Sequence, residues 1–165
     1  MLMIRLAKAL MTAMLACFAA VAAYNNVVDY DTNYEFARHV LSMDTTFPHS
    51  TLRDRAITDP VLWHFAYVLI IAAEALTALF LAFGALALLF VVNARAERFN
   101  GAKGWMVAGA TIGFALWFFG FMVVGGEYFA MWQSEEWNGQ EPAFRFYMTL
   151  IAVTIFVCQR DEDLA

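Results

Sequence analysis

The sequence predicts an all-α polytopic membrane protein, a four-transmembrane-helix bundle that forms a single domain over residues 1–165. Hydrophobic residues make up 62% of the chain and charged residues 15%, whereas soluble domains are roughly 45–50% apolar. The charges gather in short polar stretches between four long apolar tracts. Each tract is near the roughly 17–25 residues that cross a bilayer as a helix. A water-soluble fold of this size could not cover so much apolar surface.

The first expected span covers residues 6–24. Arg5 and Lys8, followed by an apolar run, also resemble a cleavable signal peptide. The run is long enough to cross the bilayer. We therefore expect it to be retained as an uncleaved helix.

Residues 25–59 are expected to form a structured periplasmic segment, because the segment is too long for a simple turn. Residues 32–35 fit a capping box, which predicts that a short helix begins there. Apolar residues at positions i, i+4 and i+7 of this helix share one face, which suits a helix lying on the outer membrane surface or over the bundle. The candidate residues for an interaction on this outer surface are Phe36, Val40, Met43 and Phe47.

The second expected span covers residues 60–92, where Asp59 is the predicted N-cap and Pro60 the first helical residue. Glu74 lies well inside this span. An ionised carboxylate there costs several kcal/mol unless it is paired or hydrated, and a protonated one avoids the cost. Glu74 is therefore the foremost functional candidate, and the alternative is a hydrogen-bonded packing residue.

The third expected span covers residues 105–124 and contains Gly109 and Gly113 at a spacing that lets another helix approach closely. This contact is expected within the chain, with a dimer or partner contact as the alternative. Gly104 and Gly120 are expected to extend the same glycine face. The pair of glycines at residues 125–126 is expected to end or kink the helix.

The fourth expected span covers residues 143–158, opened by Glu141 and Pro142. Lysine and arginine are more frequent on the side that holds both chain ends and the link between spans two and three, which predicts that both termini are cytoplasmic. The bases on that side are Arg5, Lys8, Arg95, Arg98, Lys103 and Arg160, and those on the other side are Arg38, Arg53, Arg55 and Arg145.

No catalytic, cofactor-binding or metal-binding residues are predicted. The three histidines, His39, His49 and His64, are dispersed and lack the spacing of a metal or haem site. Hydrolase, phosphate-loop and dinucleotide-binding motifs are absent from the sequence, so no motif indicates an enzymatic activity. No basic face suited to nucleic acid is visible.

Several stretches resemble a bacterial family of predicted small integral membrane proteins, known as domain of unknown function 2165. The resemblance is densest over residues 39–48, with further matches at Asn25-Asn26, Asp29-Tyr30, Asn33, Phe36 and Arg55-Ala56-Ile57, and it extends to Glu74. It implies residence in the bacterial inner membrane. It carries no activity over to this chain.

The leading functional hypothesis is a non-enzymatic accessory, stabilising or assembly subunit of a larger inner-membrane complex, because the chain has packing motifs but few polar groups within its spans. The alternative is a small ion-, proton- or lipid-handling protein that uses Glu74. The expected partners are membrane lipids and another integral membrane protein or complex, and a homo-oligomer is left open.

Overall fold

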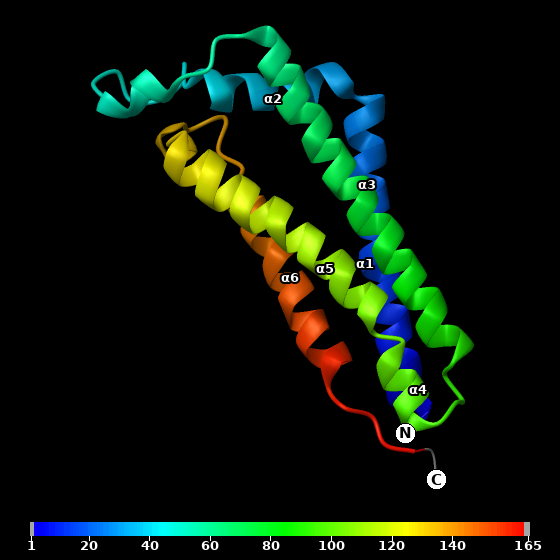
Figure 1. Ribbon diagram of the computed structural model, residues 1–165. Coiled ribbons are helices and arrows are strands. Elements are labelled where there is room, and N and C mark those ends of the chain that lie inside the picture. Colours follow the sequence, from blue (N-terminus) through cyan, green and yellow to red (C-terminus); the bar gives the residue numbers. More distant parts are fainter. Residues whose placement is uncertain (1, 164–165) are drawn as a thin grey trace.

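The computed structural model describes residues 2–163, and within that range every regular element is helical. Four helical segments are long and apolar enough to cross a membrane, which confirms the predicted all-α fold with four spans (Figure 1). These segments are Leu2–Val28, Pro60–Phe90, Ala96–Tyr128 and Gln140–Cys158.

Helices α1 (Leu2–Val28) and α3 (Pro60–Phe90) pack against each other along the bundle. The predicted cap of α3 is confirmed, because the Asp59 carboxylate accepts a hydrogen bond from the Val61 amide at 2.9 Å. The inward face of α1 is made of mostly small residues spaced three or four apart, as an α-helical stripe requires. The buried residues of α1 are Arg5, Lys8, Ala9, Thr12, Leu15, Ala16, Ala19 and Ala23.

The third span joins α4 (Ala96–Gly101), α5 (Gly104–Phe114) and η2 (Ala115–Tyr128), and η2 is a π-helix. The Phe129 amide at its end donates to the Val124 carbonyl five residues earlier, at 3.0 Å. The predicted end or kink at residues 125–126 is wrong, because the wider helix continues through both glycines to Tyr128.

Two glycines allow the backbones of α3 and α5 to touch. A β-carbon on Gly84 would lie 2.7 Å from the Met106 amide nitrogen, and one on Gly109 would lie 2.8 Å from the Leu81 amide nitrogen. Gly104, in contrast, has no neighbouring atom within 4 Å of the β-carbon position. The expected extension of the glycine face to Gly104 is therefore wrong, since this residue lies outside the helix contact.

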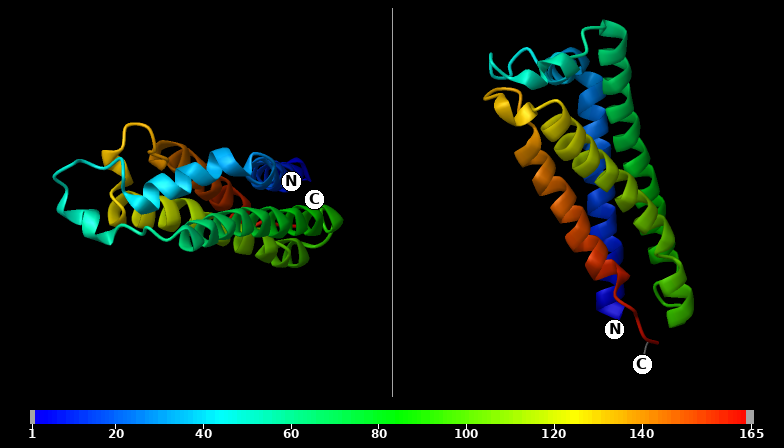
Figure 2. Two further views of the ribbon diagram at one scale, coloured as in Figure 1. Left: turned by 90° about the horizontal axis from the view of Figure 1, so that it is seen from above. Right: turned by 60° about the vertical axis from the view of Figure 1, so that its left-hand side comes forward.

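Helix α2 (Tyr30–Ser42) crosses the end of the bundle, and we call this the α2 end (Figure 2). The predicted start at a capping box is wrong, because α2 already begins at Tyr30 and Asp29 makes no side-chain cap bond. Instead, the Asn33 side chain donates to the Asp29 carbonyl at 3.0 Å.

The inward face of α2 packs on the turn that follows η2. Val40 and Met43 lie in one buried cluster with Phe129 and Met131. Met43 ends the helix in a left-handed conformation, with φ of 52°. Two short turns complete this end of the molecule, η1 (Thr51–Arg55) and η3 (Met131–Gln133).

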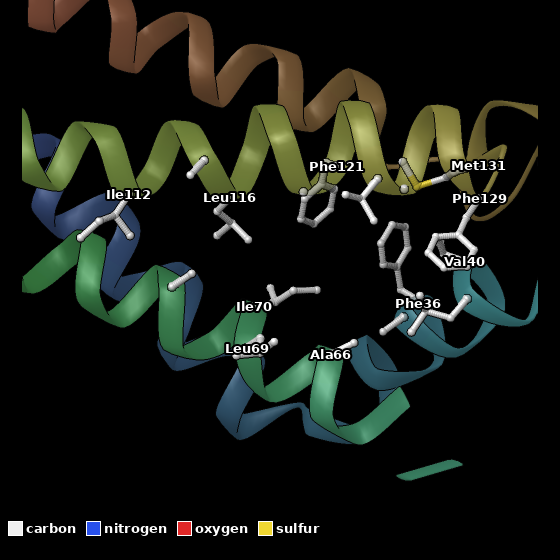
Figure 3. A pocket seen from close by; sticks show the side chains of 17 residues that line it. Phe36, Val40, Ala66, Leu69, Ile70, Ile112, Leu116, Phe121, Phe129 and Met131 are labelled. Carbon is white, nitrogen blue, oxygen red and sulfur yellow. The ribbon is translucent and has the colours of Figure 1, made fainter. Parts of the chain in front are cut away.

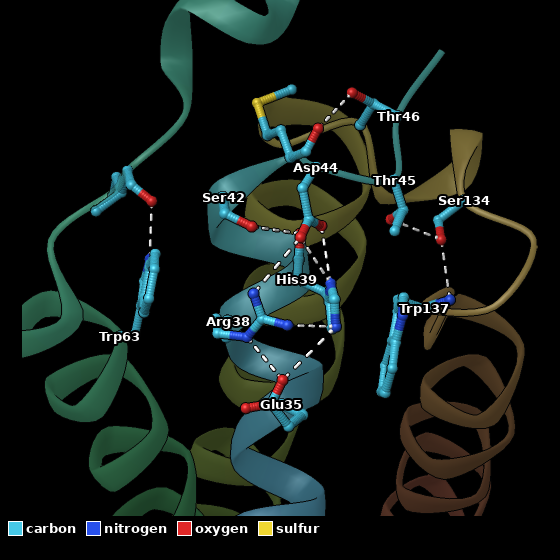
Figure 4. A network of polar contacts seen from close by, with 12 residues as sticks. Glu35, Arg38, His39, Ser42, Asp44, Thr45, Thr46, Trp63, Ser134 and Trp137 are labelled. Carbon is cyan, nitrogen blue, oxygen red and sulfur yellow. Dashed lines mark hydrogen bonds and ion pairs between the residues drawn. The ribbon is translucent and has the colours of Figure 1, made fainter. Parts of the chain in front are cut away.

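Polar contacts also hold α2 in place (Figure 4). The His39 imidazole lies 2.8 Å from the Asp44 carboxylate and stacks on Trp137, which precedes α6 (Gln140–Cys158), at a ring distance of 4.5 Å. The Thr45 hydroxyl donates to the Ser134 hydroxyl at 2.9 Å. Helix α2 and the turn that follows it are thus joined to the loop between η3 and α6.

The opposite end is closed by a cluster that we call the basic clasp, made of Arg5, Lys8, Lys103 and Asp161. The two lysine ammonium groups donate to the same Asp161 oxygen, Oδ2, at 2.6 and 2.7 Å. Within the described residues, Arg5 donates to backbone carbonyls only, including that of Glu162 at 2.6 Å. All four clasp side chains belong to residues at most 6% exposed. The clasp ties the start of the chain to the tail that follows α6.

Candidate functional site

Glu74 lies in the middle of α3 and is 5% exposed, so the structure places it inside the bundle. The Asn26 side-chain amide, near the end of α1, donates to Glu74 Oε2 at 2.7 Å. The Tyr67 hydroxyl donates in turn to the Asn26 carbonyl at 2.8 Å. The three residues therefore form a continuous polar chain between α1 and α3.

This polar chain borders a small cavity of about 210 Å³ within the bundle. Its polar lining residues are Asn26, Asn33, Tyr67 and Glu74, while Trp117 from η2 and Phe146 from α6 supply apolar walls. A cavity of this kind holds a small polar group or a few water molecules, provided that they find hydrogen-bond partners on the wall. Glu74 and Asn26 are such partners.

A larger apolar cleft opens between α3 and η2 beneath α2 (Figure 3). Its volume is about 460 Å³, and all 17 residues that line it are apolar. Helices α3 and η2 lean apart toward the α2 end, while α3 and α5 remain in close contact farther along (Figure 1). The cleft is therefore the space left by this divergence, roofed by Phe36 and Val40 of α2.

The cleft and the Glu74 cavity adjoin each other. Phe36, Ile70 and Phe121 line both spaces. The Phe36 and Phe121 rings stack with centroids 5.9 Å apart. Gly139 makes room for this pair, because a β-carbon there would lie 2.8 Å from the Phe36 ring. Two aromatic rings and one isoleucine thus belong to the walls of both the apolar cleft and the cavity that holds the Glu74 carboxyl group.

The π-helix shapes the wall of the cleft. The residues that η2 contributes come in neighbouring pairs, spaced five and then four residues apart. A regular α-helix repeats every 3.6 residues and would turn such pairs away from a common face, whereas bonds between residues five apart widen the turn. The wall pairs are Ala115-Leu116, Gly120-Phe121 and Val124-Gly125.

The structure separates the other residues singled out from the sequence. A β-carbon on Gly113 would lie 2.8 Å from the Leu150 side chain of α6 and 3.0 Å from the Thr77 side chain of α3, whereas the nearest atoms to one on Gly109 belong to α3. Val40 and Met43 are buried, and this burial leaves them unavailable for the expected outer-surface interaction. Phe47 is 52% exposed.

Asn26 and Tyr67 are missed by sequence reasoning. Tyr67 precedes Glu74 by two helical turns, so helical periodicity places both on one face of α3. This periodicity could have identified Tyr67 as a residue of the site. Asn26 gives no such signal, because its contact with Glu74 joins residues of different helices.

The histidines lie apart from this site. The His64 ring stacks on Tyr34 at 4.2 Å and its Nδ1 atom is 2.9 Å from the Tyr30 hydroxyl. Among residues 2–163, no group of three or more His, Cys, Asp or Glu side chains is placed to hold a metal ion. The site offers a carboxyl, an amide and a phenol instead.

Comparison with known proteins gives one result of substance. No curated protein and no solved structure matches the chain. A family model described as predicted small integral membrane protein (DUF2165) matches residues 4–160. This match covers nearly the whole chain, from the start of α1 to the tail after α6. The chain therefore belongs to the DUF2165 family of predicted small integral membrane proteins.

Proposed function

We propose that this protein is a non-enzymatic lipid-handling protein that binds a lipid-like molecule from the bilayer. The apolar part of the ligand occupies the cleft between α3 and η2, and its polar end reaches Glu74. The observation that carries this proposal is the shared wall of Phe36, Ile70 and Phe121 between the cleft and the Glu74 cavity.

The size and chemistry of the two spaces support an amphipathic ligand. Ligand pockets are usually about 300–1,000 Å³ and mostly apolar with a few polar groups, and the cleft measures about 460 Å³. Apolar walls recognise a hydrocarbon chain. A buried carboxyl group with one donor, Asn26, can accept a further hydrogen bond. The ligand is therefore a long-chain molecule with a hydrogen-bond donor at its polar end.

The first test of ligand binding places a bulky side chain inside the cleft. Gly120 lines it, and a β-carbon there would meet its nearest atoms at 3.8 Å, so Gly120→Leu adds bulk without displacing the backbone. We expect Gly120→Leu to lose most crosslinking to a photoactivatable long-chain alcohol in detergent. Gly104→Leu is the matched control, because Gly104 has open space around it and lies outside the cleft. Equal labelling of the two variants would contradict a ligand in the cleft.

The second test concerns the polar end. The long-chain alcohol carries a donor that its methyl ether lacks, so the wild type should label more strongly with the alcohol. Glu74→Gln keeps an acceptor oxygen and should keep this preference, whereas Glu74→Leu should lose it. Loss of the preference in Glu74→Gln as well as in Glu74→Leu would show that a titrating carboxyl is needed, as in proton handling.

An accessory role in a larger complex of the bacterial inner membrane is compatible with this binding. Its support is an exposed aromatic pair outside the spans: Phe47 and Trp132 are 52% and 49% exposed and meet edge to face at 5.9 Å. Exposed apolar patches mark partner surfaces. Native detergent extraction should then yield an assembly with a defined partner, and Phe47→Ser should release it. If the wild-type protein carries no co-purifying partner after gentle extraction, this role is contradicted.

A further inference from the structure

We propose that the basic clasp is a phosphate-binding site, occupied in this structure by the protein's own tail, residues 159–163. The clasp lies at the end of the bundle away from α2, so its chemistry is independent of the function proposed for Glu74. Its external ligand is a phosphate group, carried by an anionic lipid or free in solution.

The charges of the clasp are unbalanced. Arg5, Lys8 and Lys103 are 0%, 1% and 6% exposed. Within residues 2–163, Asp161 is the one carboxylate paired with the two lysines, and Arg5 has no carboxylate partner. A buried cation without a counter-charge is costly. Three cations around one carboxylate therefore form a site for an anion with more than one negative charge.

The hydrogen-bond geometry also favours a larger anion. Both lysines converge on one oxygen of Asp161, and among residues 2–163 Arg5 reaches only backbone carbonyls. The Nε atom of Arg5 is buried and has no acceptor within the described residues. A phosphate carries three or more strong acceptor oxygens, enough to receive both ammonium groups and a guanidinium N–H.

The tail acts as a tethered competitor for this site. Its Gln159 carbonyl accepts from Lys8 and from Lys103, each at 2.7 Å, and Asp163 accepts from the Ala96 amide at 2.6 Å. A cavity of about 790 Å³ runs beside the tail and reaches Lys103. Departure of the tail removes three acids and one base, Arg160, and takes Asp161 away from Lys8 and Lys103.

The position of the clasp favours a lipid as the source of the phosphate. Arg5 and Lys8 lie in the first turns of α1, and Lys103 precedes α5, so the clasp sits where spans end. Lipid headgroups lie at this depth. A lipid phosphate is therefore held beside the clasp at high local concentration.

The first experiment removes the competitor in the full chain. Asp161→Asn should bind phosphatidic acid on the order of tenfold more tightly than the wild type, because a short tether gives the competing carboxylate a high effective concentration. Native mass spectrometry from phosphatidylcholine nanodiscs with added phosphatidic acid measures this. Glu162→Gln is the matched control: it removes the same charge from an exposed neighbour whose backbone carbonyl, the atom that meets Arg5, is unchanged. Lys103→Gln should lose the binding.

The second experiment uses the wild type and does not depend on a variant folding. Phosphatidic acid should raise amide hydrogen exchange in residues 159–163, and phosphatidylcholine alone should not. If inorganic phosphate in phosphate-free detergent also raises exchange, the clasp takes the phosphate group from either source; if it does not, the lipid is the ligand. Exchange that is unchanged by both, or equally raised by phosphatidylcholine, would overturn the proposal. So would equal binding by Asp161→Asn and Glu162→Gln.

Discussion

The Asp161 carboxylate holds the basic clasp together, since one of its oxygens accepts from both Lys8 and Lys103. Burial acts to raise the pKa of Asp161, but the hydrogen bonds from the two lysines outweigh it and hold the pKa below its ordinary value of 3.8. A carboxyl group with a lowered pKa in the folded state stabilises the fold above its ordinary pKa. That contribution is lost as the pH falls through the folded pKa.

We therefore predict that Asp161→Asn lowers the free energy of unfolding by about 3 kcal/mol at about pH 7, because removing one partner leaves buried cations uncompensated. The difference from the wild type should shrink as the pH drops below 3.8 and vanish below the folded pKa of Asp161. Thermal unfolding across a pH series measures it. Glu162→Gln should show no such difference, and a pH-independent gap for Asp161→Asn would contradict the ionic role.

At the residue scale, hydropathy is enough to identify Glu74, because a carboxyl group within an apolar tract is conspicuous. Its partner Asn26 is not identified, since it lies at the end of another tract among residues of ordinary polarity. The clasp is likewise not predicted from the sequence. There, Lys8 and Lys103 serve only to orient the spans across the membrane, and the fold brings both of them to Asp161.

At the scale of helices, the glycines of α3 and α5 differ in what they touch. The β-carbon positions of Gly84 and Gly109 meet backbone atoms of the facing helix at 2.7 and 2.8 Å. The Gly113 position instead meets side-chain ends of Leu150 and Thr77. Side chains can move aside, whereas a helix backbone must shift as a whole.

Alanine substitutions should reflect this difference. We predict that Gly84→Ala and Gly109→Ala each lower the free energy of unfolding by about 1–3 kcal/mol, as overpacking does, and that Gly113→Ala costs less. Gly104→Ala, with open space around it, should be neutral. Denaturation in mixed micelles, followed by circular dichroism, ranks the four variants. A Gly109→Ala variant as stable as Gly104→Ala would argue against a tight helix contact.

Some helix boundaries could be predicted from the sequence, and others could not. The start of α3 is encoded locally by Asp59 and Pro60, so it could be predicted. The start of α2 could not, because its first turn is held by Asn33 rather than by the capping box. The π-helix of η2 has no local signature, and its register depends on the space that α3 and α2 leave around it.

At the scale of the whole molecule, the start of α1, the α4 region and the tail lie together at one end of the bundle (Figure 1). Reporter fusions after Ala165 and within residues 93–104 should both give a cytoplasmic signal, because lysine and arginine are concentrated in these segments. A fusion within residues 44–58 should give a periplasmic signal. A periplasmic signal at either of the first two sites would overturn the predicted orientation.

Composition and hydropathy predict the fold class because a bilayer permits few architectures for apolar tracts of this length. They do not predict the cleft, which arises from the angle between α3 and η2. That angle is set by contacts distant in sequence, such as Gly84 with Met106 at one end and Phe36 with Phe121 at the other.

The basic clasp also bears on how the protein is made. Arg5 donates to the carbonyl of Glu162, so the contact joins two residues 157 positions apart in the sequence. The clasp cannot close until residues 159–163 have been translated and have left the ribosome. In the orientation we predict, Arg5 and Lys8 are exposed to water during insertion. Their positive charges then keep the start of α1 on the cytoplasmic side. The same two side chains become buried only once the tail, residues 159–163, has reached them.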